Sequence, residues 1–357
     1  MLDYSEPLMV KYLHNKGVAE GIPVTGNFEL TQRCNFNCKM CYVHDYSQKA
    51  DPLSADDWIN LAQQAKDAGT IFLLLTGGEP LLRDDFEQIY TALVKMGFLV
   101  SINTNGSLLE KYFSLFDKMP PTRINISLYG GDNSAYNSLC GNNAFDKVLN
   151  SIRKLKDMGI SICLNTIFTP DNISDYKKIV DISKELNVPL KPTSYAYPAV
   201  RLGEKNENIR FTPEQAAEYT FLIDKYRLEK DIYTNRLNKL LTHSEGPKAN
   251  KVHCRAGRAS FWITADGVMR PCGMMPEPDS RPLVDSFKKA WEDIRSATEA
   301  IRTPEECITC KYAGVCNVCA AMCRAETGEF NKVPKYICQM TKHLYSLAER
   351  WNRDNDN

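Results

Sequence analysis

The chain has 357 residues, of which 43% are hydrophobic and 25% are charged, as in ordinary water-soluble globular proteins. Its 44 Lys and Arg residues balance 44 Asp and Glu residues, and this zero formal charge argues against nucleic acid as the main partner. The length exceeds that of one small core and suits two domains.

The N-terminus and the hydropathy predict a cytoplasmic protein. Residues 1–6 lack the positive and apolar regions of a secretory signal. The longest apolar run, residues 71–75, is far too short to span a bilayer, so no membrane partner is expected. In a reducing compartment, thirteen cysteines indicate metal ligation rather than disulfides.

Along the first half of the chain, apolar runs alternate with amphipathic stretches. Strands are predicted at residues 27–30, 71–76, 98–103, 123–128, 160–167 and 189–195. Helices are predicted at residues 54–68, 84–96, 145–158 and 174–186, and another begins at residue 108. Strands that alternate with helices of this length predict a parallel sheet, which could close as a full or partial barrel or stay open.

After residue 197 this alternation ends. Residues 198–211 have the composition of a loop, and Thr212 begins a helix with Pro213 and Gln215 in a capping pattern. Residues 242–253 form a second polar linker.

The last part of the chain has a different character. Residues 261–264 and 268–272 flank an Asp-Gly turn, which predicts a β-hairpin that brings Cys254 and Cys272 together. Regular helices are expected to fade until a C-terminal helix at about residues 338–351.

Three cysteines on one short segment give the strongest chemical signal. Cys34, Cys38 and Cys41 have the spacing C-x3-C-x2-C. Iron–sulfur clusters are usually held by four Cys thiolates, so three thiolates would leave one iron of a four-iron cluster open for chemistry. A zinc knuckle or three unrelated thiols is the simpler alternative.

This spacing resembles the signature of the radical S-adenosylmethionine (SAM) superfamily. The resemblance implies a [4Fe–4S] cluster whose open iron binds SAM, and an electron transfer that splits SAM to a 5′-deoxyadenosyl radical. That radical takes a hydrogen atom from the substrate, and an external reductant such as flavodoxin or ferredoxin supplies the electron. The implied fold is α/β, a partial (β/α)6 TIM-like barrel with its active site at the carboxyl ends of the strands.

The resemblance extends to the segment Thr-Gly-Gly-Glu-Pro at residues 76–80, where two glycines allow a close approach of the backbone to a ligand. The family's GGE motif hydrogen-bonds the amino group of SAM, which implies this role for Gly77, Gly78 and Glu79. Ordinary turn chemistry is the alternative for the polar residues at other strand ends. The other SAM contacts that the resemblance implies are Met40, Asn105, Ser127 and Asn165.

Eight more cysteines follow residue 253. Their pattern, C-x12-G-x4-C, then C-x2-C-x5-C and a distal Cys, resembles the SPASM extension of radical SAM enzymes, a small Cys-rich α+β domain. The resemblance implies two auxiliary four-iron clusters, and a zinc ribbon is the alternative. By this resemblance the first cluster is held by Cys254, Cys272 and either Cys319 or Cys323, and the second by Cys307, Cys310, Cys316 and Cys338.

The chain departs from the SPASM pattern at its end. The usual segment continues as C-x3-C, whereas here Cys316 is followed by Cys319 and then by Cys323. If both Cys319 and Cys323 bind iron, the first auxiliary cluster has four cysteine ligands. If only one of them binds, one iron of this cluster lacks a cysteine ligand and can contact the substrate.

These motifs divide the chain into five expected parts. They are an N-terminal extension (1–25), a radical SAM core barrel (26–197), a linker with a helix (198–251), the SPASM domain (252–340) and a C-terminal helix (341–357).

The resemblance makes a radical SAM oxidoreductase the expected function. SPASM enzymes most often modify ribosomally made peptides, by thioether or carbon–carbon cross-links, epimerisation or oxidation. Fewer than thirty residues precede the predicted barrel, so a separate carrier for the peptide leader is expected. The alternatives are a small-molecule enzyme, such as one of tetrapyrrole-type oxidative decarboxylation, and a non-enzymatic iron–sulfur or zinc protein.

Two further residues bear on the reaction. Cys140, near the predicted barrel mouth, could donate a hydrogen atom in peptide epimerisation, although a small buried hydrophobic residue is the simpler interpretation. Gly273 stands where sulfatase-maturing relatives carry an Asp base, which weighs against that activity.

Overall fold

The computed structural model describes residues 6–43, 50–199, 209–242 and 250–355. Within these ranges, eight strands form one sheet in the order β6-β5-β4-β3-β2-β1-β7-β8. Strands β1 to β6 pair in parallel, and β6 and β8 are the edges, so the predicted partial barrel is confirmed. The parallel strands are β1 (Thr25–Thr31), β2 (Phe72–Gly77), β3 (Leu99–Thr104), β4 (Arg123–Ser127), β5 (Ile162–Ile167) and β6 (Leu190–Thr193).

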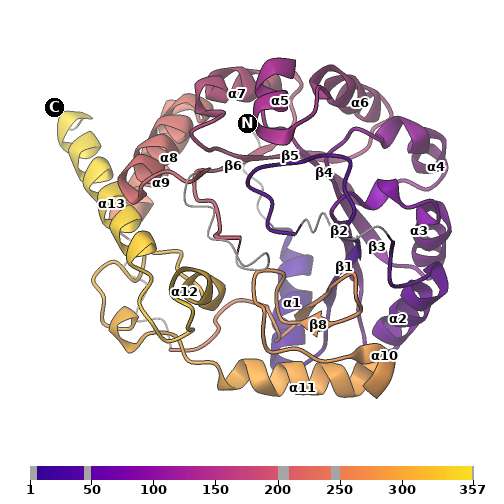
Figure 1. Ribbon diagram of the computed structural model, residues 1–357. Coiled ribbons are helices and arrows are strands. Elements are labelled where there is room, and N and C mark those ends of the chain that lie inside the picture. Colours follow the sequence, from indigo (N-terminus) through magenta and orange to yellow (C-terminus); the bar gives the residue numbers. More distant parts are fainter. Residues whose placement is uncertain (1–5, 44–49, 200–208, 243–249, 356–357) are drawn as a thin grey trace.

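Helices in the crossovers cover the outer face of this sheet (Figure 1). Ser54 begins the first of them with the predicted capping box, since it accepts the N–H of Asp57 at 3.2 Å and the Asp57 carboxylate accepts the N–H of Ser54 at 2.8 Å. A helix that was not predicted, α5 (Asn133–Cys140), follows β4. The predicted helices are α2 (Ala55–Asp67), α3 (Phe86–Lys95), α4 (Phe113–Lys118), α6 (Phe145–Asp157) and α7 (Tyr176–Glu185), with a 3₁₀ turn at Leu109–Tyr112 before α4.

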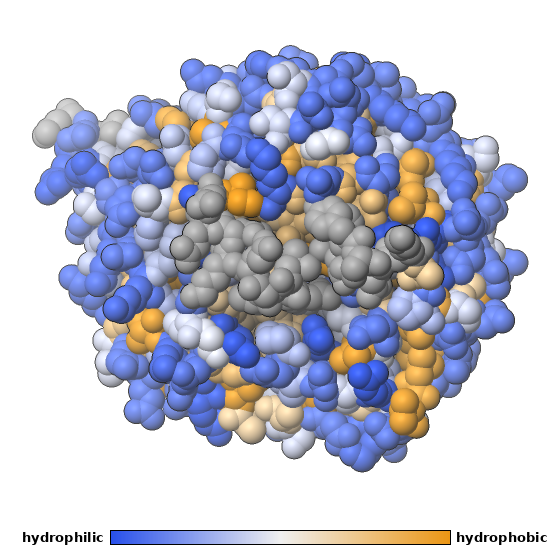
Figure 2. All heavy atoms as spheres, in the orientation of Figure 1, coloured by the Kyte–Doolittle hydropathy of each residue, from blue (hydrophilic) through white to orange (hydrophobic). Residues whose placement is uncertain are grey.

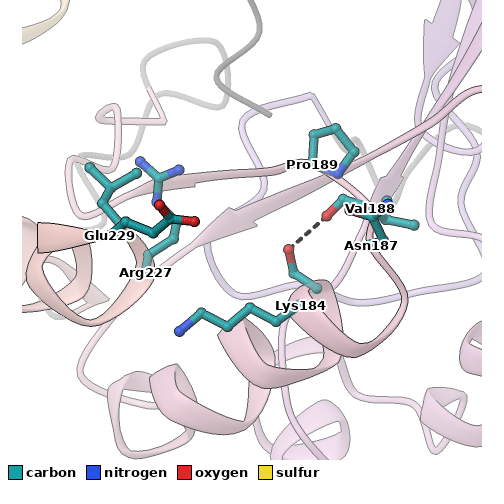
Figure 3. Close-up of a pocket in the computed structure, with 8 residues that line it drawn as sticks. Lys184, Asn187, Val188, Pro189, Arg227 and Glu229 are labelled. Carbon is teal, nitrogen blue, oxygen red and sulfur yellow. Dashed lines mark hydrogen bonds between the residues drawn. The ribbon is translucent and has the colours of Figure 1, made fainter. Parts of the chain in front are cut away.

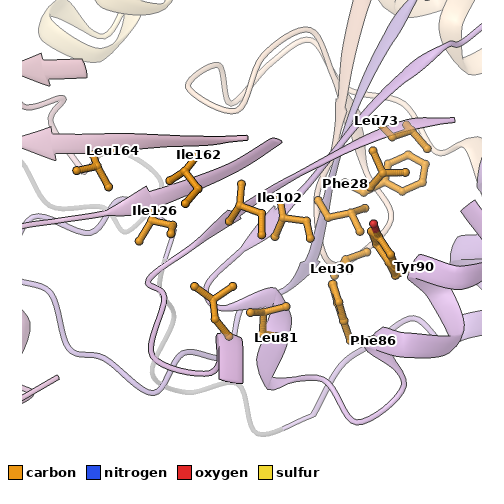
Figure 4. Packing of buried hydrophobic residues seen from close by; sticks show 14 of the residues in the cluster. Phe28, Leu30, Leu73, Leu81, Phe86, Tyr90, Ile102, Ile126, Ile162 and Leu164 are labelled. Carbon is orange, nitrogen blue, oxygen red and sulfur yellow. The ribbon is translucent and has the colours of Figure 1, made fainter. Parts of the chain in front are cut away.

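The main hydrophobic core lies between the strands and these helices. Ile102, Ile126 and Leu164 have no exposed surface and belong to the same core cluster as Phe28 and Leu30 of β1 (Figure 4). Successive side chains of a strand point to opposite faces, so the residues between these apolar positions face the interior of the barrel.

That interior face is polar on β3, β4 and β5. Asn103, Asn125, Ser127 and Asn165 are all half-buried. The Asn125 side-chain amide donates to the Asn103 side chain at 2.8 Å, and Ser127 is the register partner of Asn165. The barrel therefore presents hydrogen-bonding groups to its interior near the carboxyl ends of these strands.

The cysteine-rich part extends the barrel sheet. Strand β7 (Ser260–Ile263) pairs in parallel with β1, and β8 (Met269–Arg270) pairs antiparallel with β7. The predicted hairpin is thus confirmed, whereas its attachment to the barrel was not predicted. Across this junction the Trp262 indole N–H donates to the Glu29 carboxylate at 2.7 Å.

The prediction that regular helices fade after residue 253 is wrong. Helix α11 (Phe287–Ala300) buries an apolar face at helical spacing and packs on β7, where the ring centroids of Phe261 and Phe287 are 5.0 Å apart. Two shorter helices, α10 (Pro282–Asp285) and α12 (Ala320–Thr327), lie in the same part of the chain.

Four further helices complete the described α-helical elements. Helix α1 (Leu8–Glu20) precedes β1. Helices α8 (Pro213–Arg227) and α9 (Lys230–Thr242) follow β6, and the C-terminal helix α13 (Lys335–Asn355) packs against both of them (Figure 1). Thr212 begins α8 with the predicted capping box. Parts of the predicted loop and linker, residues 200–208 and 243–249, lie outside the described residues. None of the described helices has the length and apolar character needed to cross a membrane.

Candidate functional site

The loop that carries Cys34, Cys38 and Cys41 packs against the C-terminal end of α5. The N–H groups of Asn37 and Lys39 donate to the carbonyls of Cys140 and Leu139 at 2.9 and 3.0 Å. These carbonyls end a helix and need partners outside it, so they fix the backbone on both sides of Cys38. α5 was not predicted, and its anchoring role could not be read from the loop.

The three thiols of this loop are half-buried. Burial raises the pKa of Cys34 to about 12. A hydrogen bond with Cys140 and burial together raise the pKa of Cys38. Thiols in such surroundings are held as thiolates when they coordinate metal, because the metal supplies the compensating positive charge.

Gly77 and Gly78 lie directly against the backbone of the cysteine loop. The N–H groups of Gly78 and Glu79 donate to the carbonyls of Thr31 and Arg33 at 2.8 and 2.9 Å. A Cβ atom at Gly77 would lie 2.2 Å from the Thr31 carbonyl oxygen, and one at Gly78 would lie 2.3 Å from that of Arg33. The two glycines are therefore required for the GGE segment and the cysteine loop to pack together.

The Glu79 carboxylate is fully buried and joins the GGE segment to the end of β3. It accepts the Thr104 hydroxyl at 2.8 Å and the N–H groups of Asn105 and Leu81 at 2.7 and 3.0 Å. Burial raises the pKa of Glu79 to about 7 against the effect of these donors.

Asn105 connects the end of β3 to the cysteine loop. Its side-chain amide donates to the Asn35 side chain at 2.9 Å and approaches Cys34 Sγ at 3.8 Å. The side-chain oxygen of Asn105 accepts hydrogen bonds from the backbone N–H and the hydroxyl of Ser107, at 2.9 and 2.7 Å. Asn35 and Ser107 were not singled out in the sequence, because each looks like an ordinary turn residue.

The other residues predicted to contact SAM lie at separate points around the barrel mouth. Ser127 and Asn165 are neighbours on β4 and β5. Met40 lines a cavity of about 680 Å³ together with Tyr42 of the cysteine loop. The same cavity is lined by β6 with the residues after it, by α8, α9 and α13, and by Met274 and Asn317 of the cysteine-rich part. On the face shown in Figure 2, hydrophilic side chains predominate and hydrophobic ones form scattered groups among them.

The C-terminal cysteines fall into two groups. Cys254, Cys272 and Cys319 are close enough for their charges to interact: burial and the other two thiolates raise the pKa of Cys272 to about 11. Burial and then Cys338, Cys316 and Cys310 raise the pKa of Cys307 to about 11. Cys307, Cys310, Cys316 and Cys338 also border one small cavity of about 50 Å³, which Cys319 and Cys323 line as well.

The charge of Cys319 acts on both Cys254 and Cys272. Cys319 is the N-cap of α12, so its side chain leaves the chain before the helix begins. Cys323 lies one turn into α12 and is fully buried, with Cys307, Cys316, Cys338 and Cys319 as its charged neighbours. Among the described residues, no group of three or more His, Cys, Asp or Glu side chains is set to hold a single metal ion.

A second cavity, of about 370 Å³, lies where α7 leads into β6 (Figure 3). Its wall includes Lys184, Asn187, Arg227 and Glu229, and the Ser183 hydroxyl donates to the Val188 carbonyl at 2.7 Å. None of its lining residues is a cysteine or a predicted SAM contact. It shares Pro189 and Arg227 with the 680 Å³ cavity and therefore adjoins it.

Comparison with known proteins identifies the family. The model of the radical SAM superfamily matches residues 28–182. A protein of Sulfurisphaera tokodaii named "Probable GTP 3′,8-cyclase" is 30% identical over 294 residues, which cover 77% of this chain and 91% of that protein. The AdoMet-dependent heme synthase of Methanosarcina barkeri is 24% identical over 332 residues, or 87% of this chain and 94% of the synthase.

Solved structures share the fold. SuiB of Streptococcus suis bound to S-adenosylmethionine superimposes with a TM-score of 0.67 at 17% identity, over 95% of this chain and 84% of SuiB. The enzyme anSMEcpe with bound AdoMet gives a TM-score of 0.71 at 17% identity, over 94% of this chain and 100% of that chain.

The donor groups fit the cofactors that this family implies, a [4Fe–4S] cluster and SAM. Three half-buried cysteines share one loop, a glycine segment packs on that loop, and a polar strand face lies inside the barrel. The Cys-rich C-terminal part likewise suits the auxiliary clusters of a SPASM domain. By its sequence and its fold, the chain belongs to the radical SAM superfamily and is an enzyme of that family.

Proposed function

We propose that this enzyme oxidises a substrate bound in the 680 Å³ cavity, between a SAM cleavage site and an auxiliary iron–sulfur centre. The observation that carries the proposal is the composition of the cavity wall, which includes Met40 and Tyr42 of the first cysteine loop as well as Met274 and Asn317. The last two residues lie near Cys272 and Cys316 in the sequence. A substrate here is accessible to hydrogen abstraction at one end and to electron removal at the other.

In this proposal Cys34, Cys38 and Cys41 hold the [4Fe–4S] cluster that binds SAM, and a bound cluster supplies the electron that splits SAM to the 5′-deoxyadenosyl radical. Gly77 and Gly78 let the GGE segment approach the cluster, and Glu79 and Asn105 hold the surrounding loops in position. Ser127 and Asn165 offer hydrogen bonds to SAM from the interior of the barrel.

The auxiliary centres in this proposal have distinct ligand sets. Cys254, Cys272 and Cys319 hold the first auxiliary cluster. Cys307, Cys310, Cys316 and Cys338 hold the second, and Cys323 packs beside it. Electrons arrive from an external carrier such as flavodoxin or ferredoxin, in a reducing cytoplasm.

The first candidate substrate is a side chain of a ribosomally made peptide. SuiB was crystallised with its precursor peptide SuiA, and anSMEcpe with the Kp18Cys peptide, and both have the fold of this chain. The cavity wall here offers apolar and aromatic contacts, including Leu237, Leu344 and Tyr195. Such a wall suits an inserted side chain better than a highly charged ligand.

A small-molecule substrate is the second candidate. It is supported by the 30% identity to the protein named "Probable GTP 3′,8-cyclase" and by the resemblance to the heme synthase. The cavity volume lies within the range of small-molecule sites, about 300–1,000 Å³. Arg227 and Arg236, which line the cavity, both form ion pairs with Asp224, at 2.9 and 3.2 Å. Their charges are thus partly neutralised, which argues against a triphosphate as the substrate.

The candidates are separated by anaerobically reconstituted enzyme given SAM and a reductant. Three additions are compared: peptides encoded beside the gene, GTP, and a tetrapyrrole with propionate side chains. The peptide proposal expects 5′-deoxyadenosine formation that rises with peptide, and a peptide product lighter by about two hydrogen atoms for a new bond. If the enzyme converts GTP or the tetrapyrrole and none of the peptides, the peptide proposal is rejected and the substrate is a small molecule.

The control is the triple substitution of Cys34, Cys38 and Cys41 by Ala. This variant should form no 5′-deoxyadenosine while it retains the iron of the C-terminal centres. SAM cleavage that survives the triple substitution would refute the radical mechanism.

A further inference from the structure

Tyr197 lies between the cavity of about 680 Å³ and the group formed by Cys254, Cys272 and Cys319. Its hydroxyl is 3.8 Å from Cys319 Sγ, within hydrogen-bond distance for sulfur. The same residue lines the cavity, so one side chain is shared by the two sites.

The ring of Tyr197 is held in place by its surroundings. It packs edge-on against Tyr195, with ring centroids 4.9 Å apart. The Tyr195 hydroxyl donates to the Glu326 carboxylate at 2.8 Å, and Arg210 binds that carboxylate at 2.5 Å. Tyr197 also packs with Cys319 against a small apolar cluster that includes Val252 and Met275.

The separation of 3.8 Å between the Tyr197 hydroxyl oxygen and Cys319 Sγ allows a hydrogen bond. Either atom can donate, and a deprotonated Cys319 that coordinated iron would accept the Tyr197 O–H. A donor to a cluster thiolate stabilises the reduced, more negative state of the cluster and raises its reduction potential.

We propose that Tyr197 is a positioning residue for the first auxiliary iron centre, whose Cys319 sulfur accepts the Tyr197 hydroxyl. This inference rests on the proposed ligand set Cys254, Cys272 and Cys319. It assigns the Tyr197 ring as the wall between the substrate and this centre, and the hydroxyl as the group that favours electron acceptance there.

The electron balance of the step is complete with groups already named. SAM and one electron from the external reductant give methionine and the 5′-deoxyadenosyl radical, which takes one hydrogen atom from the substrate. The substrate radical then gives one electron to the first auxiliary centre and one proton to water as its new bond forms. A higher potential at that centre makes the electron transfer more favourable, and about 59 mV corresponds to a factor of ten for one electron.

The test compares Tyr197→Phe with Tyr195→Phe in the full-length, anaerobically reconstituted protein. Each change removes one hydroxyl from the same segment, but only the Tyr197 hydroxyl faces a cysteine sulfur. Both variants are made with Cys34, Cys38 and Cys41 replaced by Ala, so that only the auxiliary centres titrate. Tyr197→Phe should lower the midpoint potential of one centre, seen by EPR during a redox titration, and leave the other unchanged. Tyr195→Phe should shift neither.

A spectroscopic readout covers the case in which Tyr197→Phe loses iron. In ENDOR spectra of the reduced protein with intact Tyr197, one auxiliary centre should show a signal from a coupled proton in H₂O. This signal should disappear in D₂O, because the hydroxyl proton exchanges. Absence of that proton, or equal midpoints in Tyr197→Phe and its parent, overturns the role of Tyr197. The iron content of the protein separately tests the proposed ligand set Cys254, Cys272 and Cys319. Formation of 5′-deoxyadenosine by the unsubstituted enzyme tests the proposed function. A failure of the Tyr197 role, of the ligand set or of the function can therefore be told apart.

Discussion

The Glu79 carboxylate accepts the backbone N–H of Asn105 at 2.7 Å, and this contact joins the GGE segment to the end of β3. Asn105 in turn donates to Asn35 beside the first cysteine. The buried carboxyl group therefore fixes the GGE segment to the end of β3, and Asn105 connects both to the cysteine loop. The arrangement gives Glu79 a structural role before any ligand is bound.

The first prediction is a pH dependence of stability that Glu79 causes. Its pKa is raised from 4.5 to about 7 in the folded protein, mainly by burial. The protonated form is therefore favoured by folding, and its stabilisation is complete below about pH 4.5 and lost as the pH rises through about 7. The loss is roughly 3 kcal/mol, since one pKa unit corresponds to about 1.4 kcal/mol.

This is measured by urea unfolding of the apoprotein at several pH values, with Glu79→Gln as the comparison. The difference in free energy of unfolding between the two proteins should change between pH 4.5 and 7 and stay level above pH 8. A difference that is constant across this range would contradict the assigned pKa.

The second prediction concerns the contact of Gly78 with the cysteine loop. A Cβ at this position would lie 2.3 Å from the Arg33 carbonyl oxygen, which is backbone and cannot move aside alone. Gly78→Ala should separate the GGE segment from the loop, reduce iron bound at Cys34, Cys38 and Cys41, and cost about 1–3 kcal/mol of stability. Iron content and SAM-dependent changes in the EPR spectrum measure the effect.

Gly97→Ala is the control, because its Cβ would have no neighbouring atom within 4 Å. Its φ of +88° makes Ala cost stability there, but iron content and SAM response should match the parent protein. Equal losses in the two variants would mean that the close approach at Gly78 has no special role.

The third prediction separates Cys319 from Cys323. Cys319 interacts with Cys254 and Cys272, whereas Cys323 is buried beside the second group. Cys319→Ala should lose one auxiliary cluster, about four iron atoms per chain, while Cys323→Ala should keep both. Iron and sulfide analysis after reconstitution decides this, and the reverse pattern would exchange the two assignments.

The fourth prediction addresses Cys140. Its thiol is fully buried and hydrogen-bonds with Cys38, and it is not among the described residues that line the large cavity. Cys140→Ala should therefore retain substrate-dependent 5′-deoxyadenosine formation and the normal product, with a stability loss of about 1 kcal/mol. A variant that forms 5′-deoxyadenosine but no product would instead make Cys140 a hydrogen-atom donor.

Local features of this protein could be predicted because a few neighbouring residues specify them. The capping boxes at Ser54 and Thr212 and the hairpin at residues 261–272 follow from side-chain to backbone hydrogen bonds and turn geometry over a few positions. Helix α11 carried an equally local signal, the spacing of Phe287, Ala290, Trp291 and Ile294, and could have been predicted.

The sequence by itself determined the family signature, whose residues share one loop, and the six strands of the barrel, whose apolar runs are local. Only the tertiary structure decided that β7 pairs with β1, that Cys319 interacts with Cys254 and Cys272, and that Tyr197 both contacts Cys319 and lines the 680 Å³ cavity. These contacts join residues far apart in the chain. Their partners are chosen by the packing of whole elements, which no local pattern of residues encodes.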